Sequence, residues 1–300
     1  MAKSLNSIRT PVEDKILYTI NAILISVFCL IVALPIWYII VSSFSSGTAI
    51  LGNRVFLWPV EPTLNGYKAV FSHKYILTGY RNSLLYTVLG TAINLCVTAA
   101  CAYPLSRKDF PFRRFFMVLF VITMYFGGGL IPSYIVNINL GLINNIWVMV
   151  IPGAMSVYYM ILVRTFMINS IPGELFEAAS IDGCSDAYYF FAIMLPLMKP
   201  IIAVVGLYYA VGHWNAYFGA MIYLNDKRLF PLQLILREIL VSSKVNLEEI
   251  HDVDLLKALI GLEALLKYSL IIVATVPILC VYPFIQKYFV KGVMVGSLKG

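Results

Sequence analysis

The chain has 300 residues, of which 60% are hydrophobic and only 12% are charged, and its mean hydropathy is +0.84. This composition excludes a water-soluble domain, because too few polar residues remain to cover a hydrophobic core. The net charge of +7 does not indicate nucleic-acid binding, since the basic residues are dispersed and no platform of alternating aromatic and basic residues occurs. The sequence therefore predicts an all-α integral membrane protein.

The N-terminal part predicts a tail, a span and a loop. Residues 1–15 read as a cytoplasmic tail. The apolar run from residue 16 to 44 is longer than a signal-peptide core and has no small-residue cleavage site, so we expect it to stay as an anchor. A helix needs about 20 residues to cross roughly 30 Å of hydrocarbon. The first span is predicted near residues 17–44 with a kink at Pro35, and turn signals predict an outer loop over residues 45–81.

The next three spans are predicted from a run of small residues, a cluster of basic residues and a run of glycines. A second span near residues 82–105 is rich in small side chains that allow close helix packing. The short loop after it holds four basic residues, Arg107, Lys108, Arg113 and Arg114. By the positive-inside rule, this loop is expected to lie in the cytoplasm. The following uncharged run suits two spans, near residues 115–135 and 146–167. Glycines 127–129 predict a break in the first of these, tolerated only inside protein or along a cavity.

Helix start signals follow the fourth predicted span. Ser170 is a candidate N-cap, and Pro172 is tolerated in a first helical turn. Glu174 and Glu177 stand where the positive end of a helix dipole favours acidic groups. A short helix is therefore predicted to start near residue 171. Gly183 predicts a turn after it, because glycine adopts left-handed backbone angles without penalty.

A second short helix and two more spans complete the prediction. Ser185 and Asp186 predict its N-terminal cap, and Pro196 and Pro200 are expected to end it. Together, the two short helices and the glycine turn are predicted to form a cytoplasmic, amphipathic helix-turn-helix loop over about residues 170–200. A fifth span near residues 201–224, a polar external segment over 225–262 with room for a short interfacial helix, and a sixth span near 268–285 follow. The predicted architecture is six transmembrane helices, with a membrane domain over residues 16–290, a C-terminal tail over 291–300 and both termini in the cytoplasm.

This loop resembles a known family. Glu177-Ala178-Ala179, then Asp182-Gly183, then Ile193-Met194-Leu195-Pro196, resembles the cytoplasmic loop of ABC-importer permeases, which docks into a cleft of the ATPase subunit. Residues 171–185 are similar to the carbohydrate-uptake branch and, within it, to its maltose-permease-like second subunit. Residues 286–300 resemble the tail of the same branch. Cys184 stands where many members have Ala, a small change that leaves docking intact.

The resemblance implies a function and partners. It implies a permease subunit, in the cell membrane, of an ATP-driven importer for oligosaccharides or polysaccharide fragments. The implied partners are a second, similar permease, two ATPase subunits that bind ATP and Mg²⁺, and an external sugar-binding protein, with membrane lipid around them. The chain itself lacks G-x-x-x-x-G-K-[ST], so no nucleotide site, cofactor or enzyme activity is expected in it. The implied ATPase-coupling residues are Glu177, Ala178, Ala179, Asp182, Gly183, Leu195 and Pro196.

Aromatic and amide side chains near the end of the predicted fifth span are candidates for a sugar pathway. Sugars stack their C–H faces on aromatic rings, and their hydroxyls need hydrogen-bonding side chains. The alternative is an aromatic belt at the membrane surface, which occurs whatever the cargo. Together with one residue beside the glycine run, the candidates are Tyr125, Tyr209, His213, Trp214, Asn215 and Tyr217.

Other functions are weighed against this one. A permease for a non-sugar solute would share the loop. A secondary transporter is disfavoured because no predicted span contains Asp or Glu. An intramembrane glycan-processing enzyme would need converging acidic residues, and the candidates are Glu248, Glu249, Asp252 and Asp254. The three histidines, His73, His213 and His251, lack metal-ligand spacing, and the five cysteines lack CxxC spacing and are interpreted as packing residues.

Overall fold

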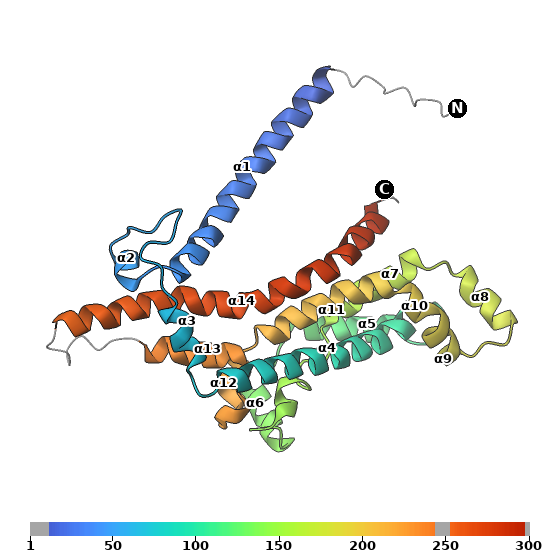
Figure 1. Cartoon of the computed structure of the whole chain (residues 1–300). Coiled ribbons are helices and arrows are strands. Elements are labelled where there is room, and N and C mark those ends of the chain that lie inside the picture. Colours follow the sequence, from blue (N-terminus) through green and yellow to red (C-terminus); the bar gives the residue numbers. More distant parts are fainter. Residues whose placement is uncertain (1–11, 244–252, 298–300) are drawn as a thin grey trace. The chain divides into compact units, whose positions relative to one another are not determined.

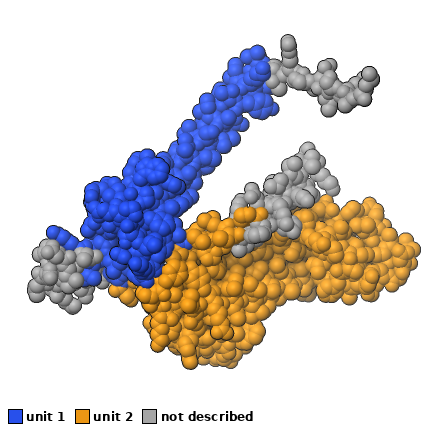
Figure 2. Space-filling model, in the orientation of Figure 1, with its two compact units in different colours: residues 1–70, 243–272 blue, residues 71–242, 273–300 orange. Residues whose placement is uncertain are grey.

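A computed structural model of the protein describes residues 12–243 and 253–297. Its regular elements over these residues are all helices, which confirms the all-α class (Figure 1). The chain divides into two compact units, residues 1–70 with 243–272 and residues 71–242 with 273–300 (Figure 2). Each unit combines segments that are distant in the sequence, so neither is a simple N- or C-terminal half.

The first unit contains the long apolar helix α1 (Val12–Ser43), the short helices α2 (Gly47–Leu51) and α3 (Asn65–Phe71), and the first part of α14 (Val253–Ser297). Most of α1 is exposed, and its buried residues lie at its end. The backbone of Gly47 lies against that of Gly261 on α14, where a Cβ at position 47 would overlap the Gly261 carbonyl. This close approach joins α2 to α14 around a small core of Val41, Ala49, Ile50, Val55, Ala264 and Leu265.

The second unit is organised around α4 (Ile76–Ser106), which packs against α7 (Val157–Ser170), α11 (Lys199–Trp214) and α13 (Leu232–Ser242). Buried small residues on α4 let these helices come close, as predicted for the second span. The unit also contains α5 (Arg113–Tyr125), α6 (Leu130–Asn139), α12 (Phe218–Tyr223) and the short 3₁₀ helices η1 (Ile146–Met149) and η3 (Lys227–Leu229).

The glycine run breaks a helix as expected. Helices α5 and α6 are bent by 112° relative to each other, and Gly129, at φ +84°, adopts a backbone conformation that L side chains rarely adopt. A second bend of 79° separates residues 186–197 from α11. Within the described residues, three helices are long and apolar enough to cross a membrane, or up to five if each bent pair is one span. Several apolar membrane helices are thus confirmed.

Three predicted spans differ from the helices. The predicted fourth span is not one helix, because η1 and a turn at Gly153, with φ +76°, precede α7. The predicted fifth span is not one helix, since α11 ends at Trp214 and α12 starts at Phe218. Helix α14 begins inside the predicted external segment, which also contains α13, and continues to Ser297, far beyond the predicted end of the sixth span. Glu248, Glu249, His251 and Asp252 lie outside the described residues.

Candidate functional site

The predicted coupling loop forms two short helices joined at Gly183. Helix α8 (Glu174–Ile181) is preceded by Gly173 as N-cap, so the predicted cap at Ser170 and start at residue 171 are wrong, because α7 continues through Ser170. Gly183 has φ +77°, which confirms the predicted left-handed turn. Ser185 Oγ accepts a hydrogen bond from the Tyr188 N–H at 3.3 Å, which confirms the predicted cap of α9 (Asp186–Tyr188).

The second helix ends between the two predicted prolines. After α9 the chain continues through the π-helix η2 (Tyr189–Met194) and α10 (Leu195–Leu197), and the break falls at Met198. Pro196 lies within the first turn of α10 and Pro200 within the first turn of α11, where the missing N–H of proline costs nothing. Both prolines therefore also occupy helix starts. The π-helix is notable because such turns are frequent at functional sites.

Most of the predicted coupling residues lie on the exposed side of this loop. Glu177 and Ala178 are exposed on α8, and Asp182 and Gly183 are exposed at the turn that follows it. Ala179 is half-buried and packs against the core of the second unit. Leu195 and Pro196 lie on α10, where Leu195 is half-buried and Pro196 exposed. The structure thus presents a small-residue surface with two carboxylates.

An aromatic anchor holds α8 on the rest of the unit. The Phe176 ring meets the buried ring of Tyr189 edge-on, with centroids 5.1 Å apart. The guanidinium of Arg107 stacks on the Phe176 ring, and its Cζ lies 3.0 Å from the centroid of that ring. Arg107 directly follows α4, and its backbone carbonyl accepts a hydrogen bond from Arg113. The sequence analysis missed this anchor, since nothing local pairs Phe176 with Arg107.

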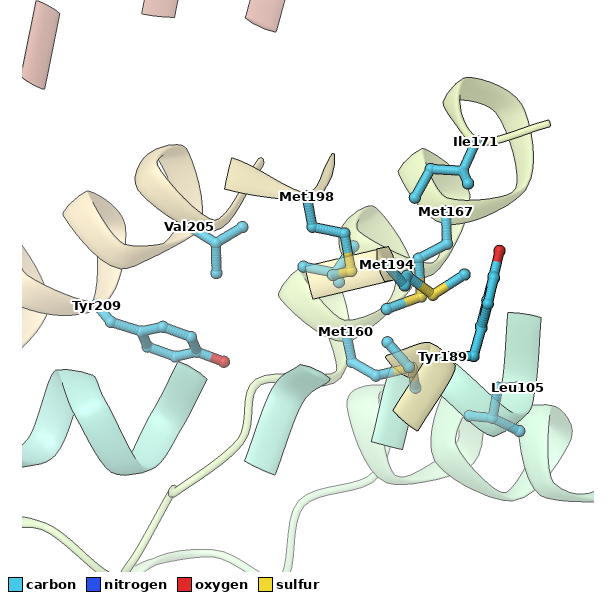
Figure 3. Close-up of a cluster of buried hydrophobic side chains, with 11 residues drawn as sticks. Leu105, Met160, Met167, Ile171, Tyr189, Met194, Met198, Val205 and Tyr209 are labelled. Atoms are coloured by element: carbon cyan, nitrogen blue, oxygen red, sulfur yellow. The ribbon is translucent and has the colours of Figure 1, made fainter. Parts of the chain in front are cut away.

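A buried cluster lies behind the anchor, between α4, α7 and the segment from η2 to α11 (Figure 3). Its side chains include four methionines that converge from α7, from η2 and from the turn before α11: Met160, Met167, Met194 and Met198. Leu105 and Tyr189 belong to the same cluster. Because methionine is unbranched and flexible, it fills irregular gaps such as those beside a π-helix. The coupling loop therefore rests on a continuous apolar base.

Tyr209, a candidate pathway residue, bonds two other elements. It is only 7% exposed, and its hydroxyl lies 2.8 Å from Thr98 Oγ1 on α4. The same hydroxyl accepts a hydrogen bond from the Ser156 N–H, 3.0 Å away, at the start of α7. Buried hydroxyls between membrane helices add directional hydrogen bonds to van der Waals packing. Tyr209 thus joins α11, α4 and α7 at one point.

His213 makes a similar junction one turn further along α11. Its Nε2 lies 3.0 Å from Asn94 Oδ1, and Asn94 Nδ2 donates to the Gly153 carbonyl at 3.1 Å. The His213 ring packs directly on Gly90, where a Cβ would overlap it. Asn94 and Thr98 were missed by the sequence analysis. Their spacing of four residues in an apolar run is a signal that could have found them.

The other candidate pathway residues have different surroundings. Trp214 is buried and its Nε1–H donates to the Ala274 carbonyl at 3.0 Å. Asn215 is the C-cap of α11. The Tyr217 ring is partly exposed, and the guanidinium carbon of Arg237 lies 6.0 Å from its centroid. Tyr125 is exposed at the end of α5. The structure thus groups Tyr209, His213 and Trp214 on α11 and places the rest at helix ends.

A polar turn fixes the chain after α12. Asn144 Oδ1 accepts hydrogen bonds from the N–H groups of Asn225 and Asp226, at 3.0 and 2.9 Å. The Arg228 guanidinium donates to the Asp226 carboxylate, and these hydrogen bonds hold the pKa of Asp226 below its usual value. The Tyr134 and Tyr223 rings stack nearby, with centroids 5.9 Å apart. This network joins the loop after α6 to the segment before α13.

Comparisons with known proteins identify relatives of this chain. No family model matches the chain. It is 40% identical over 270 residues to Protein LplC of Bacillus subtilis (strain 168), covering 90% of each chain. It is 39% identical over 273 residues to the polygalacturonan/rhamnogalacturonan transport system permease protein YtcP of the same organism, covering 91% of this chain and 94% of the relative.

A solved structure agrees with these relatives. It is the crystal structure of a bacterial ABC transporter involved in the import of the acidic polysaccharide alginate. The match has a TM-score of 0.81 and 34% sequence identity, and it covers 94% of this chain and all of that chain. The fold and these relatives thus define a permease subunit of an ABC transporter. Within that class, the chain belongs to the family of sugar-transport permeases, and it is a multi-pass membrane protein and a transporter subunit rather than an enzyme.

Proposed function

We propose that this chain forms half of the translocation pathway of an ATP-driven importer and couples that pathway to an ATPase subunit through α8. Its cargo is an oligosaccharide or a fragment of a polysaccharide. The observation that supports the coupling role is an exposed surface that Phe176 holds on the rest of the second unit. This surface consists of Glu177, Ala178, Asp182 and Gly183. Small alanines let a partner cleft approach the helix backbone, and the carboxylate of Glu177 can meet a basic group there.

The proposed topology has six spans with both termini in the cytoplasm. The five candidate spans are α1, α4, the bent pair α5 and α6, the bent segment ending in α11, and α14. Helix α7, with 14 residues, supplies the sixth together with the chain before it. The basic loop after α4 and the coupling loop after α7 then lie on the same side, as the positive-inside rule favours. Arg107 stacking on Phe176 supports this placement, because it joins the two loops.

The proposed assembly contains a second permease, two ATPase subunits that bind ATP and Mg²⁺, and an external sugar-binding protein. Closure of the ATPase pair moves α8 as a rigid body. The anchor at Phe176 passes this movement to α4 and to η2, and the hydrogen bonds of Tyr209 and His213 carry it to α7 and α11. The cavity between the two permeases then opens to alternate sides of the membrane.

Exchanging Glu177 for arginine tests the docking role. We expect Glu177→Arg to lose the ATPase during co-purification from membranes, because a positive side chain replaces the carboxylate at the contact. Glu13→Arg, at the start of α1, makes the same change of charge outside the loop and should retain the ATPase. Retention of the ATPase by Glu177→Arg at wild-type stoichiometry would contradict docking through α8.

We further propose that the cargo carries carboxylates. The names of two similar proteins mention polygalacturonan with rhamnogalacturonan and the acidic polysaccharide alginate. The exposed Tyr217 ring beside the Arg237 guanidinium pairs a stacking face with a cation, which suits a uronic acid.

The pairing of Tyr217 with Arg237 predicts a difference between cargoes. Arg237→Gln is expected to reduce uptake of oligogalacturonides by about tenfold, since a charge-assisted hydrogen bond is worth roughly 1.5–3 kcal/mol. Uptake is measured with labelled oligomers in proteoliposomes that contain the whole transporter. Arg228→Gln, an exposed arginine already paired with Asp226, serves as the matched control. An equal loss for both variants would show a general effect of charge instead.

A further inference from the structure

A cavity of about 380 Å³ lies in the second unit between α4, α11 and α14. Its wall is almost entirely apolar and includes Leu84, Leu207 and Val211, with Tyr80 and Trp214 beside them. Both aromatic residues already use their hydrogen-bond donors within the protein. The Tyr80 hydroxyl donates to the Val273 carbonyl at 2.9 Å, and the Trp214 Nε1–H donates to Ala274. The cavity therefore does not suit a sugar, whose buried hydroxyls would go unpaired.

The cavity begins near the membrane surface. Helix α4 has 31 residues and is thus about 46 Å long, against about 30 Å of hydrocarbon. Arg81, which lines the cavity, is in the second turn of α4, at the depth where lipid headgroups begin. Leu84 and Thr87 lie one and two turns deeper on the same helix. Apart from Thr87, the lining inward of Arg81 is thus apolar or aromatic, as along a phospholipid from its headgroup to its acyl chains.

Arg81 supplies a cation at one end of the wall. It is exposed, and no carboxylate pairs with it among the residues that the structure describes. We propose that the cavity holds an acyl chain of one anionic phospholipid, whose phosphate binds the Arg81 guanidinium. Arginine suits this role because its planar fork matches phosphate geometry.

Native mass spectrometry of the complete transporter tests this site. The detergent-solubilised complex is stripped of lipid and titrated with phosphatidylglycerol and with phosphatidylcholine. The wild type is expected to retain one phosphatidylglycerol, and Arg81→Gln to weaken its binding by about fivefold. Lys68→Gln, an exposed lysine of α3 that does not line the cavity, should leave binding unchanged. Leu207→Trp, which fills the cavity, should abolish retention of either lipid.

The proposal concerns lipid alone and does not rest on the coupling role of α8. Three results would overturn it. One is equal retention of phosphatidylglycerol by the wild type, Arg81→Gln and Leu207→Trp. Another is no retained lipid in the wild-type complex, which would mean that a partner subunit fills the cavity. The third is displacement of the lipid by an oligosaccharide. Since Arg81 is exposed, Arg81→Gln keeps the test valid even if Leu207→Trp fails to fold.

Discussion

Phe176→Ala is expected to abolish the stimulation of ATP hydrolysis by sugar and binding protein, while the ATPase still co-purifies. The edge-on contact with Tyr189 and the stacked Arg107 are together worth about 1–2.5 kcal/mol, so the population of α8 seated on the second unit should fall by about 5- to 70-fold. ATPase turnover in proteoliposomes, with and without binding protein and sugar, measures the effect. Docking through Glu177 and transmission through Phe176 are thereby separated.

Two further variants sharpen this test. Arg107→Lys keeps the charge but loses the planar stacking face, and we expect it to retain part of the stimulation. Phe112→Ala removes an exposed phenylalanine from the neighbouring basic loop and should behave as the wild type. Full stimulation in Phe176→Ala would show that α8 passes movement to the membrane unit through other contacts.

Gly90→Ala is expected to separate α4 from α11. The added Cβ overlaps the His213 ring, which then loses its hydrogen bond to Asn94 or forces the helices apart. Overpacking of this kind costs about 1–3 kcal/mol, so the melting temperature of the purified chain should fall by about 3–10 °C. Scanning fluorimetry in detergent measures the change.

The chain offers a matched control and a rescue. Gly212→Ala makes the same substitution on α11, where the described residues place no atom within 4 Å of the new Cβ apart from the helix's own backbone, and should not lower the melting temperature. The rescue is measured in the His213→Ala background, where adding Gly90→Ala should lower the melting temperature little, because the overlapping ring is gone. If Gly90→Ala melts like the wild type, α4 and α11 do not approach as closely as the structure indicates.

Features encoded by local chemistry were predicted well. Apolar length revealed α1 and α4, and the glycine run revealed the break between α5 and α6. The turn at Gly183 needs a residue that tolerates positive φ, and Ser185 caps through an oxygen that only a few side chains supply. Such signals need no knowledge of distant residues.

Features that depend on distant residues were missed. Proline can start a helix as well as stop one, and nothing near Pro196 shows which occurs. Tyr209 and His213 were assigned by residue type to the sugar pathway, but their partners, Thr98 and Asn94, become visible only when α4 and α11 are paired. The stack of Arg107 on Phe176 likewise joins two loops that the sequence treats as separate.

The four methionines behind the coupling loop bear on how its movement can be reversible. A rigid, close-packed joint stores strain when its elements rotate, because branched side chains fit in only one arrangement. The sulfur-containing chains of Met160, Met167, Met194 and Met198 can exchange rotamers at little cost while the cluster stays free of voids. In the proposed mechanism, this joint is compliant as well as continuous, so that energy delivered by ATP moves the spans and is not spent deforming the packing beneath them.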